Sequence, residues 1–388
     1  NYIVSDFTEL VPFETVNLIL ANPPYVRHHH ISNKLDLINK VFSEVGIKIS
    51  GLSGLYIYFI LLSHAWLEDD GVACWLIPSE FLDVNYGRKL KDYLLKEVTT
   101  LKIHRFDTAQ SKFSDALVSS AIVWYKKSIP PENHHIEFTF GESISDPEIS
   151  KKVSSDDLLV ENKWSRFPKN EIRKDNGEPK LKDYFRISRG IATGENNFFI
   201  LSYDEIIERN LPLDQFRPIL PRPKNLESLH ILSDSLGLPV SENQLFVLDT
   251  ILSIDQIERR YPSLYLYLQE GINKGVNQRY LCKSRKCWYF QEQRKISTFY
   301  CSYIGRTNDS KKSPFKFILN ESKAIVNNSY LILYPLPSLE EALKENPKLA
   351  SKIVNALNNL DSSCLIDEGR TYGGGMQKME PKELGNVN

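Results

Sequence analysis

The sequence has little cysteine, no long apolar run and almost no net charge, and each shortage excludes a class of protein. Five cysteines in 388 residues are too few for a disulfide framework, which indicates free thiols in a reducing, cytoplasmic setting. Cys282, Cys287 and Cys301 lack CxxC spacing, so no structural zinc site is expected. The longest apolar run, residues 52–67, is too short and too polar for a membrane span, so no membrane partner is expected.

The charge balance excludes a uniformly basic nucleic-acid binder but leaves room for a local basic patch. The chain carries 48 Lys and Arg against 49 Asp and Glu, for a net charge of −1. Its length of 388 residues is too great for one ordinary domain and is suitable for two or three.

The first third of the sequence has an α/β pattern. Residues 15–21 form a nearly continuous apolar run that ends at two prolines, which is typical of a buried parallel strand. Further strands are expected at 72–77, 101–106 and 117–125, and helices at 52–67 and 86–98. Such alternation predicts a mostly parallel sheet with helices on both faces.

A change of pattern follows this α/β region. Residues 126–133 are rich in proline and charge, which indicates a linker. We therefore expect a domain boundary between residues 128 and 129, with an α/β domain at 1–128 and a mixed α+β region at 129–388.

Asn22-Pro23-Pro24-Tyr25 is the sharpest chemical signal in the sequence, because it follows the expected strand at its carboxyl end. Ligands of open α/β sheets bind beyond this end of the strands. The Asn22 amide oxygen and the Pro23 carbonyl can both accept hydrogen bonds, and the prolines offer no N–H. Tyr25 adds an aromatic face. The motif therefore predicts a receptor for a planar molecule that bears an amino group.

Residues 16–27 resemble the catalytic motif of amino-methyltransferases. Other segments narrow the resemblance to the gamma-type adenine-N6 DNA methyltransferases of restriction–modification systems; they are residues 55–59, 71–81, 112–118, 186–199, 217–225, 282–289 and 369–384. The resemblance implies a partial Rossmann-like methyltransferase sheet over 1–128, followed by a mixed α+β target recognition domain over 129–388.

The resemblance also implies roles for single residues. The target adenine would leave the duplex, because its N6 cannot be reached in the stack. Asn22 and the Pro23 carbonyl would accept from N6, and Tyr25 would stack on the base. Asp6 and Phe113 would bind the target base as well. The methyl donor would be S-adenosylmethionine and the substrate double-stranded DNA.

A basic segment predicts where the chain meets DNA. Residues 279–316 contain ten basic and two acidic side chains, for a net charge of +8, and aromatic residues lie between them. Gly190 and Gly194 are expected to form a tight loop that exposes the polar residues near them. Together with the family motifs, these patterns predict DNA contacts at Arg27, Arg189, Thr193, Asn196, Arg279, Lys283, Arg285, Lys286, Trp288, Arg294, Lys295, Arg370 and Lys378. A metal site at His28–His30 is not expected, because adjacent residues point in different directions and no carboxylate or cysteine cluster lies nearby.

One family element is missing from the sequence before Asn22. Enzymes of this type place a glycine-rich cofactor loop there, but none of the 21 preceding residues is glycine. We therefore expect a fragment or split-gene subunit whose S-adenosylmethionine site lies mostly outside this chain, and which cannot bind this cofactor tightly by itself. The expected protein partner is a missing N-terminal half or a cognate endonuclease.

Two other functions remain open. The first is a non-catalytic DNA-binding specificity fragment or subunit, which the missing cofactor loop favours. The second is a protein or RNA methyltransferase, since these share the Asn-Pro-Pro-Tyr motif. The large region after the linker argues against the second alternative, because those enzymes lack a large C-terminal recognition domain.

Overall fold

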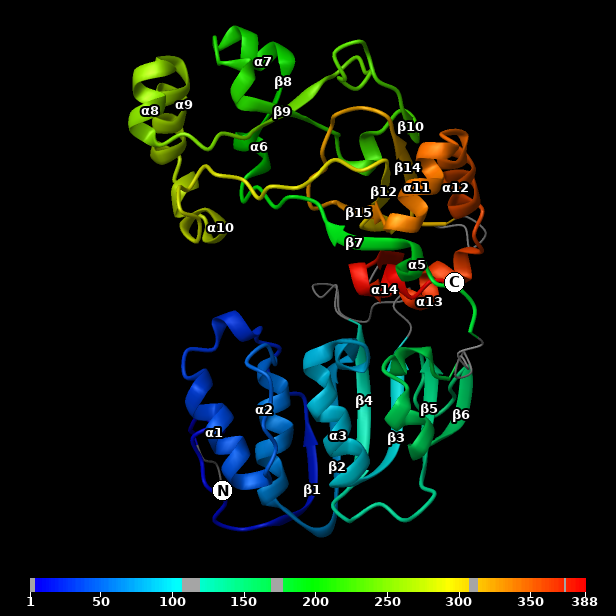
Figure 1. Ribbon diagram of the computed structural model, residues 1–388. Coiled ribbons are helices and arrows are strands. Elements are labelled where there is room, and N and C mark those ends of the chain that lie inside the picture. The colour runs from blue at the N-terminus through cyan, green and yellow to red at the C-terminus, as the bar shows by residue number, and fades with distance from the viewer. Residues whose placement is uncertain (1–3, 107–118, 169–176, 307–312, 373–374) are drawn as a thin grey trace. The chain divides into compact units, whose positions relative to one another are not determined.

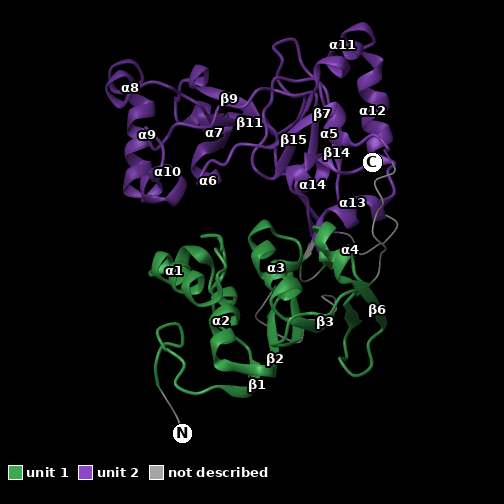
Figure 2. Ribbon diagram, turned by 60° about the horizontal axis from the view of Figure 1, so that its bottom comes forward, with its two compact units in different colours: residues 1–176, 372–375 green, residues 177–371, 376–388 purple. Residues whose placement is uncertain are grey.

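The computed structural model describes residues 4–106, 119–168, 177–306, 313–372 and 375–388, with only the backbone of Thr371. The chain forms two compact units, shown in different colours in Figure 2. Unit 1 contains residues 1–176 and 372–375, and unit 2 contains residues 177–371 and 376–388. Among the described helices, none has both the length and the apolar character needed to cross a membrane.

Unit 1 is built on a six-stranded sheet (Figure 1) with the strand order β1-β2-β4-β3-β5-β6. Its strands are β1 (Val16–Ala21), β2 (Leu67–Pro78), β3 (Thr99–Phe106), β4 (Ser120–Lys126), β5 (His135–Gly141) and β6 (Ile149–Ser154). Its helices are α1 (Lys34–Val45), α2 (Leu55–Leu62), α3 (Arg88–Lys96) and α4 (Ser155–Val160). Short 3-10 turns join them: η1 (His28–His30), η2 (Ser63–Trp66), η3 (Ser79–Leu82), η4 (Asn85–Gly87) and η6 (Trp164–Arg166).

The α/β class is confirmed, but the prediction of a mostly parallel sheet is wrong. The pairs β1–β2 and β3–β5 are parallel, whereas β2–β4, β3–β4 and β5–β6 are antiparallel. The reason is that β4 inserts between β2 and β3 and runs against both. Apolar runs predict that a strand is buried, but they do not fix its direction.

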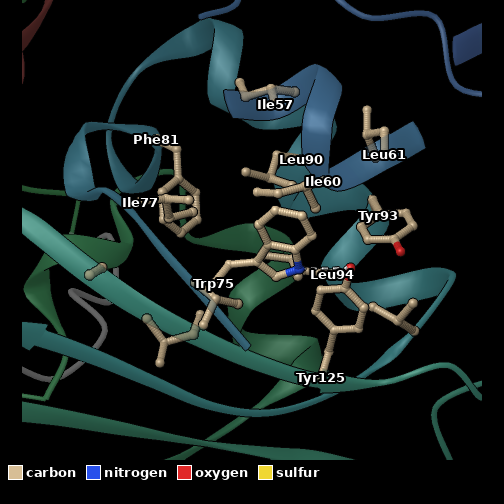
Figure 3. Packing of buried hydrophobic residues seen from close by; sticks show 14 of the residues in the cluster. Ile57, Ile60, Leu61, Trp75, Ile77, Phe81, Leu90, Tyr93, Leu94 and Tyr125 are labelled. Atoms are coloured by element: carbon tan, nitrogen blue, oxygen red, sulfur yellow. Dashed lines mark hydrogen bonds between the residues drawn. The ribbon is translucent and has the colours of Figure 1, made fainter. Parts of the chain in front are cut away.

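Most described helices of unit 1 pack on one face of this sheet and form a hydrophobic core with it. Figure 3 shows part of this core. Ala73, Trp75 and Ile77 of β2 point into it, together with Tyr125 of β4, whose hydroxyl accepts a hydrogen bond from the Trp75 indole N–H at 3.2 Å. Buried side chains from α1 to α4 belong to the same core. The prediction of helices on both faces is therefore wrong for the described residues.

The opposite face of the sheet is open along β1. Leu18 and Leu20 point away from the core and are 59% and 77% exposed. The register pairs Leu18 with Val72 and Leu20 with Cys74, so these four side chains share that face. Within the described residues, β1 pairs with a strand on one side alone. An apolar row beside a free edge is a template for another polypeptide.

The sequence located the first elements of unit 1 within a few residues. The helix expected at 52–67 is α2 followed by η2, because β2 begins at Leu67. The helix expected at 86–98 is α3, and the strand expected at 72–77 lies inside the longer β2.

The expected boundary at 128/129 falls between two strands of the same sheet, since β5 pairs with β3. The compact unit continues to residue 176. Lys91 of α3 helps to hold the added segment, because its ammonium group donates to the carbonyl oxygens of Leu82 at 2.9 Å and Asn162 at 2.6 Å. The same group lies 5.4 Å from the centre of the Trp164 ring.

The described residues of unit 2 form three smaller sheets. The largest has the order β10-β14-β12-β15-β7 and is formed by β7 (Phe185–Arg189), β10 (His230–Ile231), β12 (Phe299–Ser302), β14 (Phe317–Asn320) and β15 (Tyr330–Pro335). The second, β8-β11-β9, contains β8 (Ile200–Ser202), β9 (Phe216–Ile219) and β11 (Leu245–Leu248). The third, β13-β17-β16, contains β13 (Ile304–Arg306), β16 (Arg370–Tyr372) and β17 (Met376–Lys378).

Short helices surround these sheets, as expected for a mixed α+β region. They are α5 (Leu181–Tyr184), α6 (Asn196–Phe199), α7 (Tyr203–Glu208), α8 (Ile254–Arg260), α9 (Pro262–Asn273), α10 (Tyr280–Lys283), α11 (Pro337–Glu345), α12 (Lys348–Asn358), α13 (Ser362–Glu368) and α14 (Pro381–Gly385). The 3-10 turns are η7 (Leu213–Gln215), η8 (Pro223–Asn225) and η9 (Val276–Gln278).

The burial of Lys91 predicts that the stability of the fold depends on pH. Burial lowers the pKa of its ammonium group from 10.5 to about 8, although Asp83 and Glu161 oppose the change. Between these values the unfolded chain binds more protons than the folded chain, so the free energy of unfolding rises with pH from about 8 to 10.5. The full gain is on the order of 3 kcal/mol.

The measurement is urea unfolding of the wild type and Lys91→Met, at pH values from about 7 to about 10. The wild type should gain stability relative to Lys91→Met as the pH rises. Lys89→Met, which alters an exposed lysine on the same helix, is the control and should follow the wild type. A constant difference between the wild type and Lys91→Met would contradict the prediction.

Candidate active site and nucleic-acid interface

The Asn22-Pro23-Pro24-Tyr25 loop lies at the carboxyl edge of the unit 1 sheet. β1 and β2 run in parallel with Ala21 opposite Trp75, so the residues that follow both strands meet at one edge. β3 runs in the same direction, because β4 is antiparallel to both β2 and β3. The loop therefore occupies the position at which open α/β sheets bind ligands.

The Tyr25 side chain is held in place but keeps an accessible face. Its hydroxyl donates to the carbonyl oxygen of Leu76 at 3.2 Å, and its side chain is 38% exposed. Partial burial raises the pKa of this hydroxyl, and a hydrogen bond with Ser120 opposes the change. A tyrosine fixed at its hydroxyl and open at its ring can stack on a planar ligand.

The Asn22 side chain is exposed and makes no hydrogen bond within the described part of the chain. Pro23 is buried and Pro24 is exposed, so the first proline holds the loop against the sheet. Neither proline has an N–H group to compete for acceptors. Asn22 is therefore available to accept from a ligand amino group.

Tyr56, Glu80 and Tyr86 form a polar cluster beside the loop that sequence reasoning missed. Tyr86 donates its hydroxyl to a Glu80 carboxylate oxygen at 2.5 Å. The Tyr56 hydroxyl is buried and has no hydrogen-bond partner among the residues that the structure describes. Burial raises the pKa of Tyr56 well above its ordinary value, and the nearby acidic groups Tyr86, Glu80 and Tyr25 raise it further.

Little in the sequence points to this cluster. Tyr56 lies within an apolar helix, where an aromatic residue is ordinarily read as core. Glu80 and Tyr86 belong to two consecutive 3-10 turns, η3 and η4, which lack the periodic pattern of a longer helix. The only available signal was the position of Glu80 just after the carboxyl end of β2.

The two other expected base-binding residues are Asp6 and Phe113. Asp6 accepts hydrogen bonds from the amide and hydroxyl of Thr8 at 2.8 and 2.7 Å, and it has no hydrogen bond to the loop among the described residues. The neighbouring Phe7 packs on Trp66, which leads into the amino end of β2. Phe113 lies outside the described residues; the described residue Phe106 before it ends β3 at the carboxyl edge.

Arg27 and the histidines after it follow the loop. Arg27 is exposed, as expected for a DNA contact, and precedes η1. The rings of His29 and His30 lie 4.1 Å apart between their centres. Within the described ranges, no three His, Cys, Asp or Glu side chains gather where they could hold a metal ion.

In unit 2, the glycine loop after β7 is tight, as predicted, but does not expose the polar side chains as expected. A Cβ on Gly190 would lie 2.2 Å from the carbonyl oxygen of Asn327, so no larger residue fits. Gly194 has a φ of +88°, which favours glycine. Thr193 is 1% exposed and donates to the Asn196 side chain at 2.6 Å, so the prediction that Thr193 is exposed is wrong.

Arg189 also has a structural environment. Its guanidinium group lies 3.9 Å from the centre of the Tyr303 ring and donates to the carbonyl oxygen of Asn328 at 3.1 Å. Arg294 in turn donates to the carbonyl oxygen of Arg189 at 3.3 Å and to Glu292 at 3.1 Å. Both arginines are only partly exposed.

Several other expected DNA contacts are engaged within the fold. Arg370 pairs with Glu383 at 2.5 Å, and Lys378 pairs with Glu380 at 3.0 Å. The Trp288 ring packs against Phe198 in the core. These side chains stabilise unit 2. Basic residues in the sequence therefore do not all contribute positive charge to the surface.

Three predicted lysines remain exposed in unit 2: Lys283, Lys286 and Lys295. Arg279 is 61% exposed and pairs with Glu195 at 2.9 Å. Arg285 is half-buried and donates to the carbonyl oxygen of Ala192 at 2.5 Å. Burial lowers the pKa of Arg285, and Cys282 and Glu292 oppose the change.

Two family comparisons cover most of the chain. Residues 159–388 match the family described as Type II methyltransferase M.Eco57I, C-terminal domain. Residues 6–113 match the family described as Eco57I restriction-modification methylase.

Curated relatives agree with both matches. The chain is 28% identical over 389 residues to the Type II methyltransferase M.AccI of Acinetobacter calcoaceticus, covering 94% of this chain and 67% of the relative. It is 26% identical over 389 residues to M.XamI of Xanthomonas campestris pv. amaranthicola, covering 98% of this chain and 69% of the relative. RM.Eco57I of Escherichia coli, a Type II restriction enzyme and methyltransferase, is 22% identical over 307 residues, which is 68% of this chain and 29% of that protein.

A solved structure has a similar fold. The Type IIL restriction-modification enzyme MmeI, solved in complex with DNA, gives a TM-score of 0.52 at 12% identity, covering 84% of this chain and 42% of that one. At this identity the likeness concerns the fold alone. From the family match over residues 159–388, the chain belongs to the M.Eco57I family of Type II restriction–modification methyltransferases.

Proposed function

We propose that this chain takes part in the methylation of adenine N6 in double-stranded DNA within a restriction–modification system. The observation that carries the proposal is the Asn22-Pro23-Pro24-Tyr25 loop at the carboxyl edge of the sheet. The Asn22 side chain has no hydrogen bond to any described residue, and the Tyr25 ring is accessible. The target base would be flipped out of the duplex, because N6 is inaccessible in the stack. The family and the Type II methyltransferase relatives support this choice of reaction.

The loop would act on the nucleophile. Asn22 and the Pro23 carbonyl accept hydrogen bonds from the two N6 hydrogens, which keeps the nitrogen lone pair from delocalising into the ring and directs it outward. Tyr25 stacks on the flipped base and fixes its plane. The methyl donor would be S-adenosylmethionine. These residues fit the base side of the reaction, and its cofactor side requires further residues.

We place the residues that bind the cofactor on a polypeptide segment that docks at β1. Leu18 and Leu20 are exposed on the open face, and the free edge of β1 can accept another strand. A segment carrying the glycine-rich loop would cover both leucines and extend the sheet. Covering them would also add the hydrophobic contribution of two large apolar side chains, about 1.5–3 kcal/mol each when fully buried.

Unit 2 would recognise the DNA. Its exposed cations Arg279, Lys283, Lys286 and Lys295 come from the segment with a net charge of +8. Arg27 would add a phosphate contact beside the loop. A separate or fused endonuclease would complete the system, since RM.Eco57I is named as both a restriction enzyme and a methyltransferase. The second candidate is a DNA-binding specificity subunit without catalysis, for which the exposed cations of unit 2 would be sufficient.

The role assigned to the loop predicts that substitutions there reduce methylation without reducing DNA binding. Asn22→Ala should lower methylation by about 10²–10³-fold, because it removes an acceptor that stabilises charge developing on N6. Duplex DNA binding should be unchanged. Tyr25→Phe should keep most activity, whereas Tyr25→Ala should lose most of it. Transfer of tritiated methyl groups from S-adenosylmethionine to plasmid DNA measures this, with the cofactor-binding polypeptide added, and nucleoside chromatography identifies the methylated base.

Asn17→Ala is the matched control, since Asn17 is an exposed asparagine of β1, the strand that leads into the loop. Full activity of Asn22→Ala would refute the assigned role. Methylcytosine in place of N6-methyladenine would refute the adenine assignment. DNA binding without methylation, even with the cofactor-binding polypeptide present, would favour the specificity subunit.

The docking site on β1 predicts that a substitution there reduces the binding of the cofactor polypeptide without affecting the folding of this chain. Leu20→Glu should leave the folding of this chain unchanged, because the side chain is 77% exposed. It should reduce both the binding of the cofactor polypeptide and the restored methylation. Ile129→Glu, at another exposed apolar residue of unit 1 that is 85% exposed, should do neither. Calorimetric titration should show no tight S-adenosylmethionine binding to this chain alone; micromolar binding would contradict the proposed location of the cofactor site.

A further inference from the structure

The residues around α10 carry positive charge without acidic neighbours in sequence. The eight residues from Arg279 to Lys286 include four cations and no Asp or Glu. Arg285 is turned inward, and Arg279 pairs with Glu195. Lys283 and Lys286 are exposed and have no ion pair among the described residues. This turn therefore presents two free ammonium groups to solvent.

The turn is fastened to the glycine loop mainly through the backbone. Cys282 is fully buried, and its thiol lies 3.9 Å from the carbonyl oxygen of Thr193. A Cβ on Gly194 would lie 2.9 Å from the Cys282 sulfur, so glycine permits this approach. Arg285 donates to the carbonyl oxygen of Ala192. These contacts fix the position of α10 without using the residues that face solvent.

Tyr280 is the aromatic residue that this anchored turn presents. Its side chain is 86% exposed, and it makes no hydrogen bond or ring contact within the described part of the chain. Leu281 beside it is 38% exposed. The aromatic residues that follow differ, since Trp288 is partly buried against the core and Tyr289 is 2% exposed. An aromatic ring held out between cations has the composition of a nucleic-acid contact.

We propose that Tyr280 stacks on a DNA base, while Lys283 and Lys286 bind the adjoining phosphates. The inference rests on the proposed function of unit 2 and selects α10 as the element that contacts bases. Stacking of a base on an aromatic side chain contributes about 1–3 kcal/mol in single strands. In a duplex, the cost of opening the base step offsets part of this gain. The excess of positive charge favours DNA over a protein partner, for which an exposed aromatic residue would also be suitable.

The test is the binding of a fluorescein-labelled, mixed-sequence DNA duplex to the full chain, followed by anisotropy over a range of salt concentrations. Tyr280→Ala should raise the dissociation constant severalfold, with about 150-fold as the upper bound, and leave its salt dependence unchanged. Tyr280→Phe should bind like the wild type. Lys283→Ala and Lys286→Ala should each reduce the slope of log K against log salt by about 1.

Tyr203→Ala is the matched control. Tyr203 is 41% exposed but stands next to Asp204 and Glu205, so its loss should not change DNA binding. If wild-type chain does not bind the duplex, the proposed function of unit 2 fails. If the wild type binds and Tyr280→Ala binds equally well with an unchanged melting temperature, the role of Tyr280 alone is overturned. Unchanged DNA affinity together with lost binding of an endonuclease partner would assign Tyr280 to a protein interface and equally overturn it.

Discussion

The parallel pairing of β1 with β2 is the constraint on which the candidate active site depends. With Ala21 opposite Trp75, the residues after β1 come level with Leu76, whose carbonyl oxygen holds the Tyr25 hydroxyl. The same register turns Trp75 into the core, where the indole N–H binds Tyr125 of β4. A slip of one residue would exchange the core and solvent faces of the strand. The packing of the core and the placement of the loop are therefore one property of the sheet.

In unit 2, basic side chains serve two purposes that sequence does not separate. Arg285 and Arg294 donate to backbone carbonyls of the segment around the glycine loop, and Arg370 pairs with Glu383. Each hydrogen bond of a charged group contributes about 1.5–3 kcal/mol when its partner is well placed. Lys283 and Lys286 stay in solvent. The scaffold is built with arginine because its fork of donors can bind two acceptors at once.

Sequence reasoning was most successful where a local pattern had one physical reading. The run before Asn22 was a strand, and the family resemblance is confirmed by the match over residues 159–388. It failed where a long-range partner decided the outcome. The direction of β4 depends on which strands it joins, and the burial of Thr193 depends on α10, about ninety residues away. Lys91 is similar, because its partner carbonyl at Asn162 lies beyond the expected domain boundary. The cluster of Tyr56, Glu80 and Tyr86 has no local pattern at all.

The anchoring of α10 through main-chain carbonyls has a consequence for how such a protein can change over generations. The acceptors are the backbone carbonyl oxygens of Ala192 and Thr193, which any residue at these positions would provide. The donors are the side chains of Arg285 and Cys282. Side chains at 280, 281, 283 and 286 are therefore free to vary without loss of the scaffold. A new DNA preference could then arise by single substitutions, each tested by selection while the fold stays intact. In this turn, the residues that can change and the residues that maintain the fold are therefore different ones.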